Sequence, residues 1–288
     1  MSSASDFLRA CAPAACALLV AGCAHQPAPV GFGEATPASP EVLRVCADPN
    51  NLPFSNARGE GFENAIATIV ARDLGMRIAY TWWPQRRGFV RNTLKAGKCD
   101  LVVGVPAHYD LVTTTRPYYR STYVFVTRRD RALDIHSLDD PRLHTLQVGL
   151  HVIGDDYNNV PPAQALAWRS IVGNVRGYPI YGDYSRPDPP RELLDALARG
   201  DVDVALAWGP LAGYFAQREP VALALAPVTP QVDRGILPMT FDIAMGVRRG
   251  DTQLQQRVQA AMDRRHADIA DVLRRYGVPL LPVAPRKE

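Results

Sequence analysis

The chain has 288 residues, enough for two compact domains of roughly 100–150 residues each. Its composition, 47% hydrophobic and 21% charged, is that of a globular protein with apolar material for two cores. The formal net charge of +3 is spread along the chain without a basic run, which excludes nucleic acid as an expected partner.

The first 22 residues have the pattern of a secretory signal peptide. Arg9 precedes an apolar run, residues 10–20, that is too short to span a bilayer as a stable anchor, and small residues follow it. The run leads into Gly22-Cys23, which resembles a lipobox, in which the cysteine thiol carries diacylglycerol. An ordinary cleaved signal with a chance cysteine is the alternative. We expect export to the periplasm, with the membrane reached only through a lipid on Cys23.

Residues 23–41 are rich in proline and glycine and are expected to be a flexible tether without regular structure. With the signal removed and Cys23 lipidated, Cys46 and Cys99 are the cysteines left in the folded body. The periplasm is oxidising, so one outcome is a disulfide between them, and two buried free thiols are the other.

From residue 42 onward, hydrophobic periodicity predicts alternating strands and helices. The expected elements, in chain order, are a strand at 42–46, a helix at 62–74, a strand at 77–83, a short helix at 89–94 and a strand at 100–105. Gly75 stands where the first helix would end in a left-handed cap, and Gly97 stops the short second helix. The last strand is an almost continuous apolar run, typical of burial on both faces. This order predicts a parallel sheet with right-handed crossovers.

A second set of the same kind begins at residue 147. Its expected elements are a strand at 147–150, a helix at 163–172, a strand at 177–181, a helix at 192–197 and a strand at 202–208. The pattern L-x-x-G-x-x-D precedes the last strand of both sets, at residues 94–100 and 197–203. Both strands end at small residues or proline, Pro106 and Gly209-Pro210. The repetition indicates two similar α/β lobes.

Residues 123–127 and 241–247 predict strands that connect the lobes, and an apolar stripe from Leu254 to Leu273 predicts one final helix. Two crossings insert the second lobe in the first. The expected division is residues 42–128 and 240–288 for lobe 1 and residues 129–239 for lobe 2. The sequence therefore predicts a two-lobed α/β clamshell with two hinge crossings, whose ligand cleft lies at the carboxyl ends of the strands.

Five segments carry a resemblance to known proteins: RVCADPNNLPFS (44–55), GKCD (97–100), TRPYYRSTYVF (115–125), DIAMGVR (242–248) and YGVPLL (276–281). They resemble the type II periplasmic substrate-binding proteins, along almost the whole mature length. More narrowly, they are similar to the quinoprotein-dehydrogenase-associated MoxJ/XoxJ type, found with periplasmic methanol dehydrogenases. The first and third segments are distinctive, whereas the others recur across the superfamily. The resemblance implies the type II clamshell and a protein that binds.

The chain departs from the amino-acid receptors of this fold at both of their anchors. Those receptors place an arginine just after the strand that ends near Gly104, where it clamps a carboxylate. They also place an acid after the late strand of the second lobe, which holds an ammonium group. Here Asp110 stands near the first position and Trp208-Gly209-Pro210 follows the second strand. Import of a standard amino acid is therefore not expected.

The candidate binding residues are aromatic and polar side chains at the edge of the cleft. Aromatic rings there could form an apolar groove for a partner segment or a ligand, and packing in the core or hinge is the alternative for each. Asp155 belongs to DDYNN (155–159), which lacks the glycine and closing glutamate of a calcium loop, so no metal is expected. The candidates are Asn50, Phe54, Trp83, Tyr109, Asp110, Tyr118, Tyr119, Asp155, Trp208 and Asp242.

The sequence contains no serine-hydrolase elbow, phosphate-binding loop or zinc-protease motif, so neither an enzyme nor a cofactor is expected. A dehydratase that uses Asp110 or Asp155 as its acid is the third hypothesis. The expected function is that of a periplasmic accessory protein of a PQQ-dependent (quinoprotein) methanol or alcohol dehydrogenase. It would bind that enzyme, with or without its cytochrome c, or aid its maturation. The alternative is a receptor of an ABC importer for a small solute other than a standard amino acid.

Overall fold

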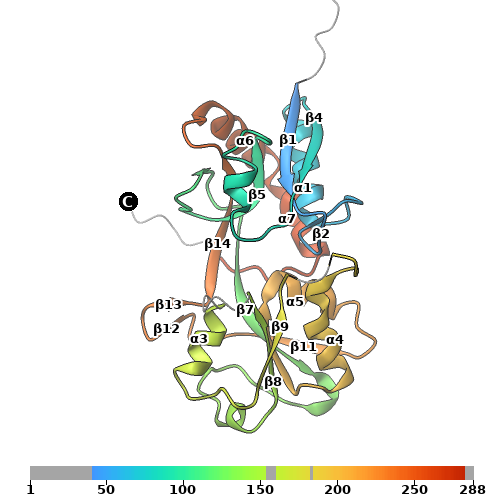
Figure 1. Cartoon of the computed structure of the whole chain (residues 1–288), viewed down its shortest axis with the longest axis vertical. Helices are drawn as coiled ribbons and strands as arrows, with labels where there is room; N and C mark the ends of the chain where they lie inside the picture. The colour runs from blue at the N-terminus through green and yellow to red at the C-terminus, as the bar shows by residue number, and fades with distance from the viewer. Residues whose placement is uncertain (1–40, 154–159, 182–183, 283–288) are drawn as a thin grey trace, which may run out of the picture. The chain divides into compact units, whose positions relative to one another are not determined.

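The computed structural model describes residues 41–153, 160–181 and 184–282. Within these ranges, strands and helices alternate in the predicted order (Figure 1). The expected signal peptide, Cys23 and the candidate Asp155 lie outside the described residues, and lipidation of Cys23 stays a prediction. No helix in the described part of the chain is long and apolar enough to cross a membrane.

The strands are β1 (Val42–Ala47), β2 (Asn50–Asn51), β3 (Ser55–Asn56), β4 (Arg77–Trp82), β5 (Leu101–Pro106), β6 (Thr113–Thr114), β7 (Tyr119–Arg128), β8 (Val148–Val152), β9 (Val175–Pro179), β10 (Val204–Trp208), β11 (Leu223–Pro227), β12 (Val232–Asp233), β13 (Leu237–Pro238) and β14 (Thr240–Val247). The α-helices are α1 (Phe62–Asp73), α2 (Phe89–Asn92), α3 (Pro161–Ala167), α4 (Glu192–Arg199), α5 (Gly209–Ala216), α6 (Thr252–Arg264) and α7 (His266–Arg275).

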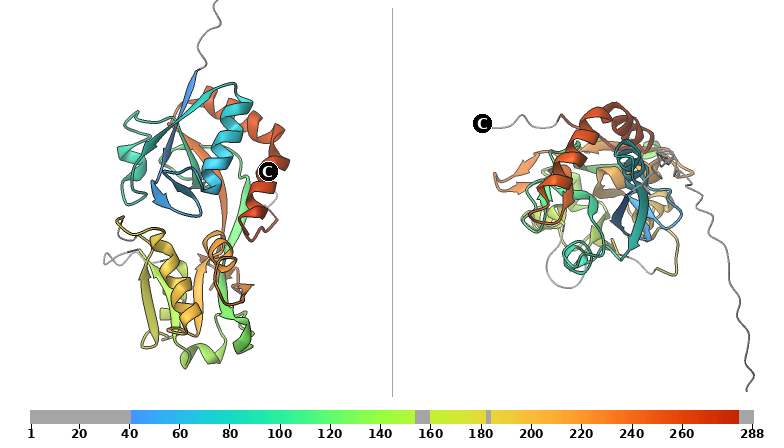
Figure 2. Two further views of the ribbon diagram at one scale, coloured as in Figure 1. Left: turned by 90° about the vertical axis from the view of Figure 1, so that its right-hand side faces the viewer. Right: turned by 90° about the horizontal axis from the view of Figure 1, so that it is seen from above.

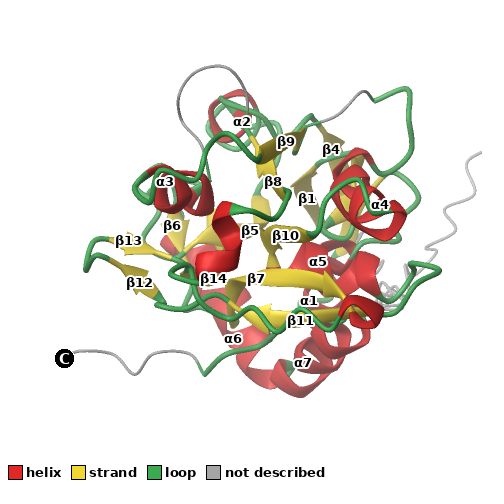
Figure 3. Cartoon of the chain, turned by 90° about the horizontal axis from the view of Figure 1, so that it is seen from below, coloured by secondary structure: helices red, strands yellow, loops and turns green. Residues whose placement is uncertain are grey.

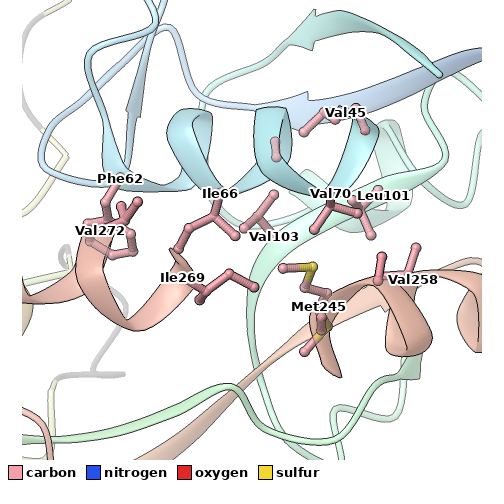
Figure 4. Packing of buried hydrophobic residues seen from close by; sticks show 14 of the residues in the cluster. Val45, Phe62, Ile66, Val70, Leu101, Val103, Met245, Val258, Ile269 and Val272 are labelled. Carbon is pink, nitrogen blue, oxygen red and sulfur yellow. The ribbon is translucent and has the colours of Figure 1, made fainter. Parts of the chain in front are cut away.

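Lobe 1 is built on the sheet β4-β1-β5-β14, together with α1, α2, α6 and α7. β1 pairs in parallel with β4 and β5, as predicted, and β14 runs antiparallel to β5. α1 and α7 lie side by side on one face of this sheet (Figure 2). The apolar side chains of α1 recur at every third or fourth residue, which directs one stripe inward. Phe62 and Ile66 of that stripe lie toward Val272 and Ile269 of α7, and Val70 lies toward Met245 and Val258 (Figure 4).

Lobe 2 is built on the parallel strands β9-β8-β10, flanked by the antiparallel β7 and β11. α4 and α5 cover one face of this sheet and α3 covers the other (Figure 3). Alternate residues of β10 serve the two cores: Ala205 and Ala207 face α4 and α5, whereas Val204 and Leu206 face α3. A strand buried on both faces has to be apolar throughout, which is why this segment reads as a continuous apolar run.

β7 and β14 connect the lobes (Figure 1), and β7 forms hydrogen bonds with strands of both lobes. The first part of β7, from Tyr119 to Thr122, pairs with β14, and the second part, from Tyr123 onward, pairs with β10 and β11. Ten of the described strands, from both lobes, therefore belong to one hydrogen-bonded sheet, while β2–β3 and β12–β13 form two separate two-stranded sheets.

The repeated L-x-x-G-x-x-D pattern has the same structural role in both lobes. The glycine of each copy lies in the left-handed region, with φ of 71° and 85°, and follows a helix or helical turn. The aspartate then accepts a hydrogen bond from a backbone N–H in the first half of the neighbouring strand or just before it. Asp100 Oδ2 lies 3.2 Å from the nitrogen of Arg44, and Asp203 Oδ2 lies 2.9 Å from that of Gln147. The repeat therefore encodes an equivalent strand connection, in agreement with the predicted similarity of the lobes.

Several local predictions were wrong or incomplete. The predicted final helix is two helices, α6 and α7, interrupted at Arg265 (φ −107°, ψ 18°). The helix expected up to residue 172 ends at Ala167, and Ser170 has a positive φ of 58°. The segment after Trp208 begins α5, with Pro210 in its first turn, where the missing N–H breaks no helical hydrogen bond. The strand β11 and the hairpin β12–β13 were not predicted.

Cys46 and Cys99 form a disulfide, so the alternative of two free thiols does not hold. Their Cα atoms lie 5.4 Å apart, and both residues are buried. The bridge joins the end of β1 to the turn before β5 and lies among the apolar residues that pack against α2.

Candidate functional site

A cavity of about 200 Å³ lies between the two lobes, at the carboxyl ends of β5 and β10. This is where an α/β sheet of this kind is expected to bind ligands. Lobe 1, including the shared strand β7, contributes Asn51, Phe54, Glu63, Gln85, Gly104, Val105, Pro106, Tyr119 and Ile243, and lobe 2 contributes Ile180, Tyr181 and Trp208. The lining is mostly apolar and aromatic, and among its described residues none carries a positive charge.

Three of the candidate residues, Phe54, Tyr119 and Trp208, line this cavity. Trp208 is the last residue of β10 and packs edge-on against Tyr123 and Phe241, with ring centroids 5.3 and 5.8 Å away. These two rings come from β7 and β14, so Trp208 is held where the connecting strands meet lobe 2. Three of the aromatic candidates therefore line one small cavity, and their role in binding stays a prediction.

Two aromatic candidates have other environments. Tyr118 packs against the core of lobe 1, and its hydroxyl donates to the carbonyl oxygen of Val103 at 3.1 Å. Trp83 is 36% exposed and lies under the ammonium group of Lys98, 4.6 Å from the ring centroid. Neither ring reaches the cavity, so core packing and a surface cation–π contact account for them.

Tyr109, Asp110 and Asp242 also lie outside the cavity. Tyr109 lines an outer hollow of about 430 Å³ that shares Gln85, Gly104, Val105, Pro106 and Tyr181 with the cavity. Asp110 is exposed and lines neither space. Asp242 faces Arg120 on the neighbouring strand, with 3.4 Å between the carboxylate and the guanidinium.

Asn50 belongs to a set of hydrogen bonds that joins the lobes. Its amide nitrogen donates to the carbonyl oxygen of Arg186 at 2.8 Å. The neighbouring Asp48 is buried and accepts from the backbone N–H of Gln85 and from the hydroxyl of Tyr184, both at 2.6 Å. Arg186 and Tyr184 come from lobe 2, so the turn after β1 contacts the opposite lobe beside the cavity.

The cavity also contains the carboxyl group of Glu63, which is not among the candidates predicted from the sequence. Glu63 lies in the first turn of α1 and is only 9% exposed. Burial raises the pKa of its carboxyl group to about 8, and the negative charge of Asp48 contributes to this rise. One signal was available: Glu63 precedes Ile66 and Val70 by three and seven residues, on the inward face of the helix. An acid in the first turn of a helix usually has a favourable interaction with the helix dipole, so its presence there does not by itself indicate a binding site.

Gly104 makes room for the Glu63 carboxyl group. A Cβ atom added to Gly104 would overlap Glu63 Oε1 and lie 3.0 Å from Glu63 Cδ. Gly104 has no positive φ, so this close approach, and not backbone conformation, requires glycine in β5.

Replacing Gly104 by alanine is therefore expected to lower the free energy of unfolding by about 1–3 kcal/mol, the usual range for overpacking a core. Chemical denaturation of the two proteins measures the difference. Gly173→Ala is the matched control and is expected to be nearly neutral, because nothing lies within 4 Å of the added carbon. A loss that persists undiminished in the Glu63→Ala background would contradict this account of the contact.

Among the described residues, no group of three or more histidine, cysteine, aspartate or glutamate side chains could hold a metal ion. The cavity brings together aromatic rings, two uncharged amides and one buried carboxyl group. Such a lining is suited to enclosing an apolar, uncharged group.

The chain has relatives among known proteins. A model of the bacterial extracellular solute-binding proteins, family 3, matches residues 43–278. The protein MoxJ of Methylorubrum extorquens is 35% identical over 262 residues, which cover 87% of this chain and 85% of MoxJ. The crystal structure of the periplasmic binding protein XoxJ from Methylobacterium extorquens is 38% identical, with a TM-score of 0.69, over 84% of this chain and 100% of XoxJ. That of MxaJ from Methlophaga aminisulfidivorans is 26% identical, with a TM-score of 0.70, over 83% of this chain and 100% of MxaJ.

Proposed function

The chain belongs to the bacterial extracellular solute-binding proteins of family 3, and within that family we propose that it is a periplasmic accessory protein that binds a quinoprotein (PQQ-dependent) methanol or alcohol dehydrogenase. The observation that supports this proposal is the similarity to MoxJ, XoxJ and MxaJ, which extends over the whole length of the XoxJ and MxaJ structures. The resemblance to the MoxJ/XoxJ type implies an association with a periplasmic methanol dehydrogenase. The family and the two-lobed periplasmic-binding-protein fold predicted from the sequence are thereby confirmed.

The lining of the cavity supports a role other than amino-acid uptake. An amino-acid receptor needs one cation for the carboxylate and one acid for the ammonium group of its ligand. The described lining has no cation, and its acid, Glu63, has a pKa raised to about 8 by burial. Apolar and aromatic surface, including Trp208, occupies most of the wall. Aromatic anchors of this kind are common at the centres of protein interfaces.

We expect Trp208→Ala to weaken binding of the dehydrogenase at least tenfold, because truncating a buried tryptophan anchor typically costs 2 kcal/mol or more. The chain would be immobilised and the purified PQQ-containing dehydrogenase passed over it at several concentrations. Trp168→Ala is the matched control: this tryptophan lies on lobe 2 beside Arg234, outside the cavity, and is expected to leave the affinity unchanged. Circular dichroism confirms that both variants are folded.

Absence of binding by the unmodified chain would overturn the proposed partner. Equal losses in the two variants would contradict a role of the cavity in holding it. The alternative, a solute receptor of an ABC importer, is supported by the small size of the cavity and predicts a bound metabolite. Mass spectrometry of the chain purified from periplasm distinguishes the two, since it identifies co-purifying proteins and small molecules together.

A further inference from the structure

The Glu63 carboxyl group faces the cavity without a partner. It lines the cavity, is more than nine-tenths buried, and makes no hydrogen bond or ion pair with any described residue. A buried polar group without a partner is unfavourable, and native proteins retain few of them. The Cα atom of Gly104 closes one side of the carboxyl group. The cavity itself is therefore the place where a partner for Glu63 can bind.

The groups around Glu63 keep it uncharged at neutral pH. Asp48, in the turn after β1, adds to the effect of burial in raising the pKa of Glu63 to about 8. Tyr80 of β4, Tyr119 of β7 and Tyr118 just before β7 also face it, and burial raises the pKa of each tyrosine above its usual value. These tyrosines stay neutral while Glu63 titrates. A neutral carboxyl group offers one O–H donor and one carbonyl acceptor side by side.

We propose that this cavity binds the carboxamide group of a small uncharged ligand, with the Glu63 carboxyl group as its hydrogen-bond partner. An acid and an amide are complementary: the O–H donates to the amide oxygen while the amide N–H donates to the acid carbonyl. The apolar part of the ligand packs against Phe54 and Trp208. The other polar side chains of the wall, Asn51 and Gln85, are uncharged and bonded to each other at 3.1 Å. This inference does not rest on the dehydrogenase as partner.

Three probes of nearly equal shape and different charge test the proposal. They are benzamide (neutral), benzoate (anionic) and benzamidine (cationic), each titrated into the whole chain at pH 7. The indole N–H signal of Trp208, assigned by comparison with Trp208→Phe, reports binding in the NMR spectrum. Benzamide is expected to bind at least tenfold more tightly than the other two. A preference for benzamidine or benzoate, or no binding of any probe, would overturn the proposal.

The dependence on pH identifies the carboxyl group responsible. Between pH 7 and 9 the protonated fraction of a group with a pKa of about 8 falls about tenfold, so benzamide affinity should fall about tenfold. Glu63→Gln keeps a donor and an acceptor in place, and its affinity for benzamide should be independent of pH. Glu60→Gln, on the exposed side of the same segment, should titrate like the unmodified chain. If benzamide affinity depends on pH in Glu63→Gln as it does in the unmodified chain, Glu63 is not the group that binds benzamide, whether or not the dehydrogenase binds.

Discussion

Glu63→Gln is expected to stabilise the protein by about 3 kcal/mol at pH 7, which is unusual for removal of a charge-bearing residue. The folded state holds the Glu63 proton with a pKa of about 8, whereas the unfolded chain releases it near 4.5. Between these two values the folded state binds one more proton than the unfolded state. The free energy of unfolding of the unmodified protein should therefore fall by about 1.4 kcal/mol for each pH unit in this window.

The measurement is urea unfolding of both proteins at pH 5, 6, 7 and 8. The advantage of Glu63→Gln should be small at pH 5, because pH 5 lies only just above the pKa of 4.5 in the unfolded chain, and should grow up to pH 8. Glu60→Gln is the control, because Asn56 and Arg58 lower the pKa of that exposed carboxyl group, so no gain is expected from it. A constant difference between Glu63→Gln and the unmodified protein from pH 5 to 8 would show that the Glu63 pKa is not raised.

A carboxyl group that destabilises the fold at neutral pH points to a role in binding. Perturbed acids concentrate at functional sites, and stabilising substitutions there commonly reduce function. Glu63→Gln separates the two effects, since it is expected to raise stability and to remove the pH dependence of binding. Both results have the same cause, which is the burial of one carboxyl group between α1 and β5.

Loss of the Cys46–Cys99 disulfide is expected to lower the free energy of unfolding by about 4 kcal/mol, as the loop-closure relation gives for a loop of this size. The two cysteines are 53 residues apart, and the loop between them contains α1, β4 and α2. Without the bridge, the unfolded chain gains the freedom of that whole segment. Cys46→Ala/Cys99→Ala, unfolded in urea beside the unmodified protein, measures the loss.

Reductant provides the matched control for this experiment. Dithiothreitol should shift the unfolding midpoint of the unmodified protein toward that of Cys46→Ala/Cys99→Ala and leave the variant unchanged. An unmodified protein that unfolds at the same urea concentration with and without reductant would contradict a stabilising bridge.

The architecture was largely predictable because its signals are local. Apolar periodicity located β1, α1, β4 and β5, and the glycines after the helices marked where each ends. The repeated L-x-x-G-x-x-D pattern indicated two lobes, since the same turn is needed wherever a helix leads into a buried parallel strand. Where local signals conflict, prediction was poorer. The apolar stripe continues through Arg265, although the helix does not, and Pro210 resembles a chain corner although it starts α5.

Residues of the cavity were predictable from the sequence only where the end of a strand directs a side chain into it. Trp208 ends β10, and Phe54 and Tyr119 stand close to other strand termini, so the cavity contains them. Tyr118 immediately precedes Tyr119 and β7, but its side chain turns away from the cavity and its hydroxyl donates to Val103 O. Such a choice between adjacent residues depends on the register of β7 with β14, which no local pattern reveals.

The sequence by itself determined the family, the α/β class and the order of the elements, because these follow from periodicity, turn residues and motifs within short segments. Tertiary structure alone decided three features: Cys46 bonds to Cys99, Asp48 accepts a hydrogen bond from the Tyr184 hydroxyl of the opposite lobe, and the Glu63 side chain is buried. These features arise between residues far apart in the chain. The pKa of Glu63 in particular is raised because folding removes water from its carboxyl group, and the sequence alone does not show which groups lose their water.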